Sequence, residues 1–179
     1  MRRAPAGADA RRECWRRTSE LKTAAVCAWH AEFCAKHPGV KLATFPHHLP
    51  LADAIEAAIK DRRPTVRIDG STKDALRQQH IDALQAGAAE AGVLSLTACG
   101  AGITLCGPRG VSVIVIPELP WTPASVFQAI ARAWRMGVTQ EVQVYILTAD
   151  GSFDADVFRT LKRKAAVSAA VVDDDEGEL

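Results

Sequence analysis

The sequence predicts an α/β fold in which helices flank both faces of a parallel β-sheet. Short segments rich in β-branched residues alternate with longer amphipathic segments of helical period along most of the chain, and this alternation is typical of parallel sheets with crossover helices. The segment 111–116 is apolar at every position except Ser112, which indicates a strand buried on both faces at the centre of the sheet. Loops after the strands should carry the functional groups, because open sheets of this kind bind ligands at the carboxyl ends of their strands.

The N-terminal half supplies the first elements of this pattern. Thr18 or Ser19 can cap a first helix, which ends at His37-Pro38-Gly39. The apolar positions of this helix follow the helical period: Leu21, Ala24, Ala25, Ala28 and Ala31. A strand is expected at 40–45, before Pro46. The next amphipathic helix is marked by Leu51, Ala54, Ile55, Ala58 and Ile59.

The remaining elements continue the alternation. A strand at 65–68 leads through a turn to a helix at 73–86, which carries Leu76, His80 and Leu84 on one side and ends at Gly87. Further strands are expected at 93–96, 111–116 and 141–147, and a last helix near 153–168. We therefore predict one domain over residues 18–168, a basic mobile arm at 1–17 and an acidic mobile tail at 169–179.

Composition narrows the possible partners and compartments. The formal net charge of +1 gives no general attraction to nucleic acid or membrane, so a local patch must recognise any such partner. No apolar run approaches the length of a membrane span. Five cysteines without a C-x-x-C pair argue against a disulfide framework and favour a reducing compartment such as the nucleus or cytosol.

One group of cysteines and histidines has to be weighed as a metal site. Cys27, His30, Cys34 and His37 lie along one stripe of the first predicted helix. A single straight helix cannot surround an ion tetrahedrally with four ligands. We therefore interpret this stripe as a half-buried polar face and expect no metal.

Four loops that follow the predicted strands carry groups compatible with phosphate. They occupy 45–48, 69–72, 97–102 and 117–123. Glycines that allow close backbone approach are Gly70, Gly100 and Gly102. Hydroxyl groups that can contact a nucleic-acid backbone without reading bases are Ser71, Thr72, Ser95 and Thr97. Trp121 adds a flat apolar face, and the joint placement of these groups indicates a nucleic-acid interface.

The segment 128–137 suits the recognition of one phosphate. As a helix ending at Gly137, it would place three polar side chains on one face: Gln128, Arg132 and Arg135. A separate stripe, which this helix can bury, contains Ala129, Ile130, Ala133 and Trp134. Two arginines one turn apart repel each other unless an anion lies between them, and guanidinium groups suit the oxygens of a transferring phosphoryl group. The alternative is an ordinary solvated pair of arginines.

Two nucleotide-binding motifs are excluded. Gly100-x-Gly102 imitates a dinucleotide-binding turn, but Leu105 occupies the third glycine position and the segment that follows is too short for a supporting helix. A Walker A loop, G-x-x-x-x-G-K-[ST], and an acidic box for magnesium are both missing from the sequence. By itself, this chain cannot hold ATP in the way that molecular motors do.

From Thr18 to Ala166 the sequence resembles the C-terminal RecA-like lobe of Swi/Snf-type DNA-dependent ATPases, nearest to the annealing-helicase branch. The most specific matches lie at 67–72, 94–105, 118–123 and 128–137. The resemblance implies that this lobe supplies helicase motifs IV to VI, while an N-terminal lobe supplies the Walker loops. It further implies that ATP with Mg is hydrolysed in the cleft between the lobes and that DNA runs across both.

The resemblance also assigns roles to single residues. Arg132 and Arg135 match the motif VI arginines that reach the γ-phosphate, and Gln128 opens that motif. Gly100 and Gly102 match motif V, which couples the nucleotide and DNA sites. The positions matched to DNA contact are Arg67, Gly70, Ser71, Thr72, Ser95, Thr97 and Trp121.

The chain departs from this pattern in motif VI. Ile130 and Ala131 stand where acidic residues are usual, Trp134 replaces a histidine and Val138 a glutamine. The resemblance implies the C-terminal motor lobe of a nuclear, ATP-dependent double-stranded DNA translocase or annealing helicase. Its partners would be DNA and an N-terminal lobe, and neither ATP nor Mg would bind to this chain alone. The altered motif leaves open an alternative, a non-catalytic relic lobe that binds DNA or protein.

Overall fold

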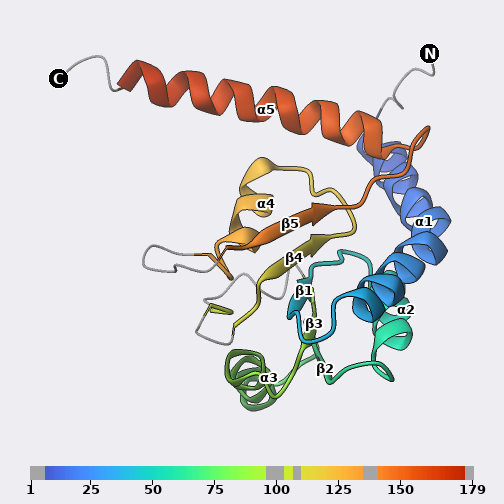
Figure 1. The fold of residues 1–179 in the computed structure, drawn as a ribbon. Coiled ribbons are helices and arrows are strands. Elements are labelled where there is room, and N and C mark those ends of the chain that lie inside the picture. Colours follow the sequence, from blue (N-terminus) through green and yellow to red (C-terminus); the bar gives the residue numbers. More distant parts are fainter. Residues whose placement is uncertain (1–6, 96–102, 107–109, 135–140, 176–179) are drawn as a thin grey trace.

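The computed structural model describes residues 7–95, 103–106, 110–134 and 141–175, with side chains up to residue 166. The strands are β1 (Leu42–Thr44), β2 (Thr65–Ile68), β3 (Ala91–Leu94), β4 (Val113–Ile116) and β5 (Gln143–Ile146). The helices are α1 (Ala8–Lys36), α2 (Leu49–Ile59), α3 (Asp74–Ala86), α4 (Pro123–Ile130) and α5 (Asp154–Asp175). Every strand pairing is parallel, so the predicted fold class is confirmed (Figure 1).

The strand order of the sheet is β2-β3-β1-β4-β5, which places β1 at the centre. Leu42 of β1 is the register partner of Ala91 in β3 and of Val113 in β4. The prediction that 111–116 forms the central strand is therefore wrong, although β4 is an interior strand buried at every position. A strand that is apolar on both faces is expected to be covered by helices on both sides. Because β1 and β3 are buried at every position as well, this pattern does not identify the middle strand.

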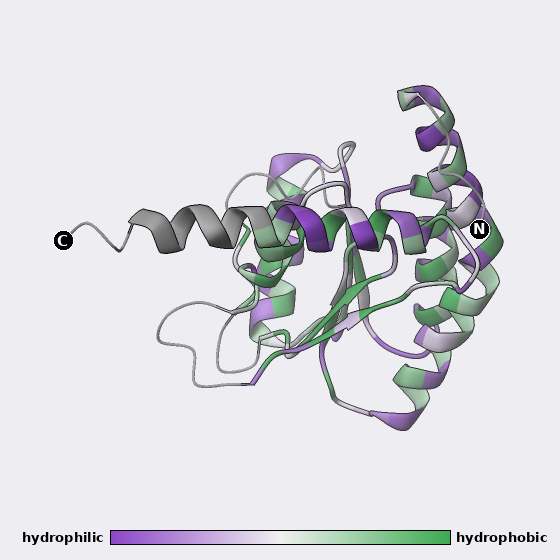
Figure 2. Cartoon of the chain, turned by 90° about the horizontal axis from the view of Figure 1, so that it is seen from above, coloured by the Kyte–Doolittle hydropathy of each residue, from purple (hydrophilic) through white to green (hydrophobic). Residues whose placement is uncertain are grey.

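Two apolar cores fill the space between the sheet and its helices. Val113 and Val115 of β4 pack on the side of α1 and α2, whereas Ile114 and Ile116 pack on the side of α3 and α4. Alternate residues of one strand thus serve both layers, as the pleat of a strand requires. Figure 2 shows the apolar residues gathered on the strands in the middle of the molecule.

The first helix begins at Ala8, ten residues before the predicted cap, so much of the predicted arm at 1–17 is helical. Arginine–carboxylate pairs one turn apart support this segment, among them Arg12 with Asp9 and Arg16 with Glu13. Trp15 is only 6% exposed, because its ring contacts the rings of His47 and Trp121. Burial of this indole anchors the N-terminal end of α1 to the sheet.

The buried face of α1 differs from the predicted apolar stripe. Leu21 is 84% exposed, whereas its neighbour Lys22 is 5% exposed. The buried stripe contains larger apolar side chains, including Trp15, Val26 and Phe33. Lys22 is accommodated there because its Nζ lies 2.8 Å from a carboxylate oxygen of Asp154. The buried face of α1 is thus the one with the larger total apolar area. Its polar side chains can be buried because they find partners within the protein.

Of the later helices, α3 agrees closely with its prediction, whereas α5 continues beyond its predicted end. Gly87 follows α3 with a φ of 80°, a left-handed conformation that suits glycine, and confirms the predicted stop. On α3, Leu84 is fully buried but Leu76 is 45% exposed. The last helix continues to Asp175, beyond the predicted end at 168 and into the predicted acidic tail. Figure 1 shows α5 extending past the body of the molecule.

Candidate nucleic-acid and phosphate interface

The loops predicted to carry function share one edge of the sheet. All five strands are parallel, so the segments after β1, β2 and β4 leave from the same edge. In the strand order, β2 and β4 are separated by β3 and β1, which is three strand spacings, or about 14 Å. The loop after β3, with Thr97, Gly100 and Gly102, lies outside the described residues. The visible candidates therefore form a row rather than one compact pocket.

The turn after β2 is held by a network around Asp69. Its Oδ1 accepts hydrogen bonds from the backbone N–H of Ser71 at 2.9 Å and from the Ser71 hydroxyl at 2.6 Å. The backbone N–H of Asp69 donates to the Thr72 hydroxyl at 3.0 Å. Hydrogen bonds from the Ser71 hydroxyl and N–H keep the pKa of Asp69 below its ordinary value. This network fixes the loop and leaves Gly70 exposed, with no atom within 4 Å of the place where a Cβ would stand.

Arg67, predicted to contact DNA, is committed within the protein. Its guanidinium lies 3.0 Å from a carboxylate oxygen of Asp53, 3.3 Å from one of Glu56 and 3.1 Å from one of Asp69. Three carboxylates around one half-buried arginine compensate its charge. The structure thus gives Arg67 a scaffolding position that joins β2 and its turn to α2.

Two further predicted contacts are enclosed by protein. Ser95 is 6% exposed, and its backbone N–H donates to the carbonyl of Ile68 at 2.8 Å. Trp121 is half-buried, with its ring centroid 5.3 Å from that of Trp15 and 5.9 Å from that of Phe153, both in edge-on geometry. The indole of Trp121 therefore joins α1, the β4 loop and the start of α5, and only part of it remains available to a ligand.

A buried carboxylate ties the β1 and β4 loops together. Glu118 is 3% exposed and accepts hydrogen bonds from the backbone N–H groups of His47 at 2.7 Å and His48 at 3.0 Å. The Nδ1 atom of His48 lies 2.5 Å from the other carboxylate oxygen. Burial alone would raise the pKa of Glu118, but hydrogen bonds from the side chain and backbone of His48 and from Ser19 hold it below its ordinary value. Glu118 is thus ionised and fixes the His47-His48 turn.

Glu118 lies in the predicted loop 117–123 and Trp15 in the predicted arm 1–17, and the sequence pattern gives neither residue a role in the site. Trp15 could have been found, because it lies four and seven residues before Ser19 and Lys22, on the same helical stripe. Glu118 carried a weaker signal, since its donors come from residues 70 and 71 positions earlier in the chain. No local pattern reports such a contact.

The helix predicted at 128–137 ends early. Thr122 caps α4, its hydroxyl accepting from the Ser125 N–H at 3.4 Å, and the helix stops at Ile130. Residues 131–133 form a turn in which the carbonyl of Arg132 accepts a hydrogen bond from the N–H of Leu105 at 2.6 Å. Helical hydrogen bonds nevertheless continue for about one turn beyond Ile130, because the N–H of Trp134 donates to the carbonyl of Ile130 at 3.0 Å. Gln128 and Arg132 therefore lie one turn apart on this segment, as predicted, although the regular helix ends earlier than expected.

The side chains of this segment separate into buried and accessible groups. Ala129 and Ala133 are buried as predicted, whereas Trp134, predicted on the buried stripe, is 54% exposed. Gln128 is exposed on α4. The Arg132 side chain is half-buried, and its Nη1 lies 3.5 Å from the carbonyl of Ile103. No carboxylate in the described part of the chain forms an ion pair with Arg132, and Arg135 lies outside that part.

On the α1 stripe that was weighed as a metal site, the His30 side chain is held by contacts within the protein. His30 is fully buried, with Nδ1 2.8 Å from the Val26 carbonyl and Nε2 3.3 Å from the Thr44 hydroxyl. Burial lowers the pKa of His30 to about 4, so the ring is neutral at physiological pH. The carbonyls of Cys34 and His37 accept hydrogen bonds from the Arg63 guanidinium, which closes the end of the helix.

Comparison with known proteins supports the assignment of this fold. Residues 33–137 match the helicase conserved C-terminal domain. The crystal structure of the C-terminal part of the Fun30 ATPase domain superposes with a TM-score of 0.60 at 27% identity, covering 68% of this chain and 39% of that one. The five-stranded parallel sheet is thus the RecA-like fold of a helicase C-terminal lobe.

Curated relatives are much longer than this chain. It is 35% identical over 157 residues to the SWI/SNF-related matrix-associated actin-dependent regulator of chromatin subfamily A-like protein 1 of Drosophila melanogaster, covering 87% of this chain and 20% of the relative. It is 32% identical over 139 residues to the human DNA annealing helicase and endonuclease ZRANB3, covering 76% of this chain and 13% of the relative. None of the helices in the described ranges is long and apolar enough to cross a membrane. The chain belongs to the helicase conserved C-terminal domain family, with relatives among SWI/SNF-related proteins and annealing helicases.

Proposed function

We propose that this chain is the C-terminal motor lobe of an ATP-dependent double-stranded DNA translocase or annealing helicase of Swi/Snf type, acting in the nucleus. One observation carries the proposal: among the described residues, the half-buried Arg132 guanidinium has one long contact, to the Ile103 carbonyl, and no carboxylate partner. In contrast, the half-buried Arg67 is surrounded by three carboxylates. A guanidinium held without a counterion suits an anion supplied from outside, such as a transferring phosphoryl group.

The proposed reaction needs a second lobe. Arg132, together with Arg135, would stabilise the charge that develops on the γ-phosphate of ATP, and Gln128 would lie beside them. The sequence contains no Walker A loop or acidic box, so the phosphate cradle and the Mg ligands would come from an N-terminal lobe. Gly100 and Gly102 would couple that site to DNA, as the family resemblance implies.

DNA would lie along the carboxyl edge of the sheet. The turn at Gly70, Ser71 and Thr72 and the loop of Trp121 are about 14 Å apart along this edge, a separation that suits an extended polymer better than a small ligand. An exposed Gly70 permits close approach of a phosphate to the backbone. Ser71 donates to Asp69 and would have to rotate before donating to a phosphate. Thr97 would extend the row beyond the end of β3, and Ser95, which is buried, would have to become accessible before it could contribute.

Reconstitution with an N-terminal lobe tests this proposal. A lobe carrying the Walker loops should give DNA-dependent ATP hydrolysis when combined with this chain, whereas this chain alone should give none. Arg132→Ala in the pair should lower the rate by about 10³-fold or more, while nucleotide binding falls much less, because the contact strengthens in the transition state. Arg132→Lys should rescue poorly, because an ammonium lacks the planar fork of donors.

Arg159→Ala is a matched control, since Arg159 is an exposed arginine on α5 paired with Asp156. It should leave the rate unchanged. Equal hydrolysis by the wild-type pair and by a pair in which Arg132 and Arg135 are both alanine would contradict the assigned role. DNA binding without any hydrolysis in the reconstituted pair would instead favour the relic lobe, the second interpretation of the altered motif.

A further inference from the structure

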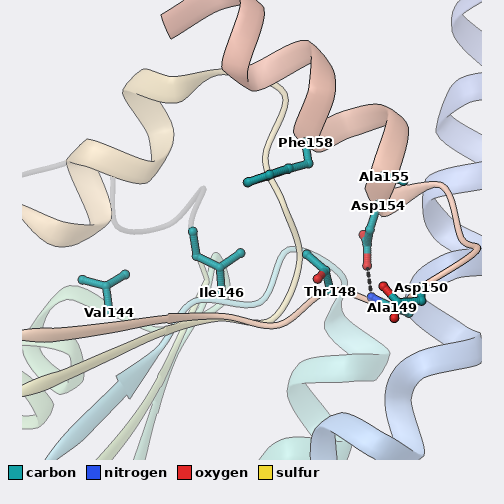
Figure 3. A pocket seen from close by; sticks show the side chains of 8 residues that line it. All are labelled: Val144, Ile146, Thr148, Ala149, Asp150, Asp154, Ala155 and Phe158. Atoms are coloured by element: carbon teal, nitrogen blue, oxygen red, sulfur yellow. Dashed lines mark hydrogen bonds between the residues drawn. The ribbon is translucent and has the colours of Figure 1, made fainter.

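A groove between β5 and α5 plays no part in the proposed motor function. It encloses about 450 Å³, a volume within the range of small-ligand sites. Val144 and Ile146 of β5 line one side, and Ala155 and Phe158 of α5 line the other. Figure 3 shows Ile146 and Phe158 reaching toward each other across this space. Val144, Ile146 and Phe158 are 38%, 39% and 41% exposed, so three large apolar side chains meet at one accessible place.

The groove exists because α5 contacts the body through other residues. Val157 and Leu161 are buried against Leu119, in a small core that is separate from the two cores of the sheet. Phe158, which follows Val157, projects into the groove instead (Figure 3). On the sheet side, Ile146 is the register partner of Ile116, which lies under the α3 and α4 layer, whereas Ile146 itself is left uncovered.

Two carboxylates stand at one end of this apolar groove. Asp154 is 1% exposed, and its Oδ2 accepts hydrogen bonds from the Lys22 ammonium at 2.8 Å and from the Ala149 N–H at 3.0 Å (Figure 3). Its Oδ1 is buried with no hydrogen-bond partner among the described groups. Asp150 is exposed at the same end, and no ion pair to it occurs in the described ranges. This end of the groove therefore offers acceptors that lack donors.

We propose that the groove binds an arginine side chain from a protein partner, next to an apolar residue of the same partner. A guanidinium can donate to the exposed Asp150 carboxylate, and its planar face can stack on the Phe158 ring. Val144 and Ile146 would cover the apolar stem of that arginine and its apolar neighbour. The exposed Asp150 carboxylate disfavours a nucleic-acid backbone at this end of the groove, although residues 148–150 follow β5 at the same carboxyl edge of the sheet as the proposed DNA contacts.

The Phe158 ring already attracts one cation. The Nζ of Lys162 lies 4.8 Å from the ring centroid. Lys162 is exposed on α5, one turn after Phe158, and competes with an incoming guanidinium for this region. Removal of its charge should therefore strengthen the binding of an arginine peptide rather than weaken it.

NMR titration of the full chain with the peptide acetyl-Leu-Arg-Leu-amide tests the proposal. Saturable shifts are expected at Val144, Ile146 and Ala149. The same peptide with citrulline, a neutral analogue of arginine, should bind at least tenfold more weakly, because it loses the charged hydrogen bonds. Asp150→Asn should lower the affinity for the arginine peptide by about tenfold, and Phe158→Ala should lower it as well. Lys162→Ala should not lower this affinity.

Asp156→Asn is the matched control, because Asp156 lies on α5 but pairs with Arg159 rather than lining the groove. It should leave the affinity unchanged. Asp154→Asn also breaks the buried pair with Lys22 and destabilises the fold, so Asp150→Asn carries the test. Equal binding of the citrulline peptide, an unchanged affinity of Asp150→Asn, or no shifts in the groove at the solubility limit of the peptide would each overturn the proposal.

Discussion

His30 is the residue whose protonation should most affect the pH dependence of folding. Burial lowers the pKa of its ring from 6.5 to about 4 in the folded chain. Between pH 6.5 and pH 4 the unfolded state binds a proton at this histidine and the folded state does not. Protonation therefore favours unfolding, and the folded state loses stability as the pH falls from 6.5 toward 4. We expect the free energy of unfolding to drop by about 2 kcal/mol between pH 7 and pH 5, measured by urea denaturation.

His30→Gln provides the comparison for this prediction. Glutamine does not titrate, so most of the drop between pH 7 and pH 5 should disappear, although the variant is less stable throughout. A smaller slope of the same sign should persist, because burial also lowers the pKa of His47. An undiminished drop in His30→Gln would show that other groups control acid stability in this range.

Glu118→Gln tests the carboxylate that joins the β1 and β4 loops. An amide cannot replace the charged acceptor of His47, His48 and Ser19, so we expect a loss of about 2–3 kcal/mol in unfolding free energy. Glu20→Gln should cost less than about 0.5 kcal/mol, because Glu20 forms an exposed pair with Arg16 on α1. Similar losses in both variants would mean that the buried network contributes little.

Residue type and spacing predicted where polar groups would gather, but not which of them would be free. The sequence predicts both Arg67 and Ser71 as DNA contacts, yet in the structure Arg67 is paired with Asp53, Glu56 and Asp69, and the Ser71 hydroxyl donates to Asp69. Arg132 has the opposite outcome, a half-buried guanidinium without such a partner in the described chain. Side-chain partners from other elements decide this difference, and a single sequence does not encode them locally.

At the scale of elements, Trp15 and Leu21 of α1 make a direct test of which helix face is buried. Trp15→Ala should lower the free energy of unfolding by about 3–5 kcal/mol, because the indole is 6% exposed and contacts His47 and Trp121. Leu21→Ala should change it by less than about 0.5 kcal/mol, because this leucine is 84% exposed. Thermal or urea unfolding measures both, and a larger loss for Leu21→Ala would reverse the assignment of the faces.

Elements with strong local signals were predicted well, whereas their ends depended on distant contacts. The strand at 65–68 and the glycine stop at Gly87 follow from β-branched residues and from left-handed backbone geometry, both local properties. The early start of α1 depends on the packing of Trp15, and the early end of α4 accompanies the hydrogen bond from Leu105 to Arg132. Tertiary contacts outweighed helix periodicity at both places.

For the whole molecule, the sequence predicted a parallel sheet and a shared functional edge but not the order of the strands. Alternating strand and helix signals require crossovers, and these place the loops after β1, β2 and β4 on one side. The strand order follows from pairings between segments that are distant in the chain, such as β1 with β3 and β1 with β4, and the pattern of each strand taken alone does not specify them. That order determines the spacing of the proposed DNA contacts, which the sequence left open.

This spacing leads to a prediction for DNA binding by the isolated chain. A row of about 14 Å spans about four phosphates of one strand, so at most about four can be neutralised, and the logarithm of the affinity should fall with the logarithm of salt concentration at a slope no steeper than about −3.6. Binding should be weak, independent of base sequence and at most about 10²-fold weaker at 200 mM than at 50 mM salt. Fluorescence anisotropy with two unrelated duplexes measures both properties.

A pair of charge changes at opposite ends of α3 then tests where the DNA lies. Gly70→Glu places a carboxylate in the exposed turn before α3, where nothing lies within 4 Å of the new Cβ, and should weaken binding at low salt by repelling phosphates. Ala86→Glu puts the same charge on the exposed last residue of α3, away from the carboxyl edge, and should have little effect. Equal losses would indicate only general repulsion, and base-specific binding that ignores ionic strength would contradict the proposed backbone contact along this edge.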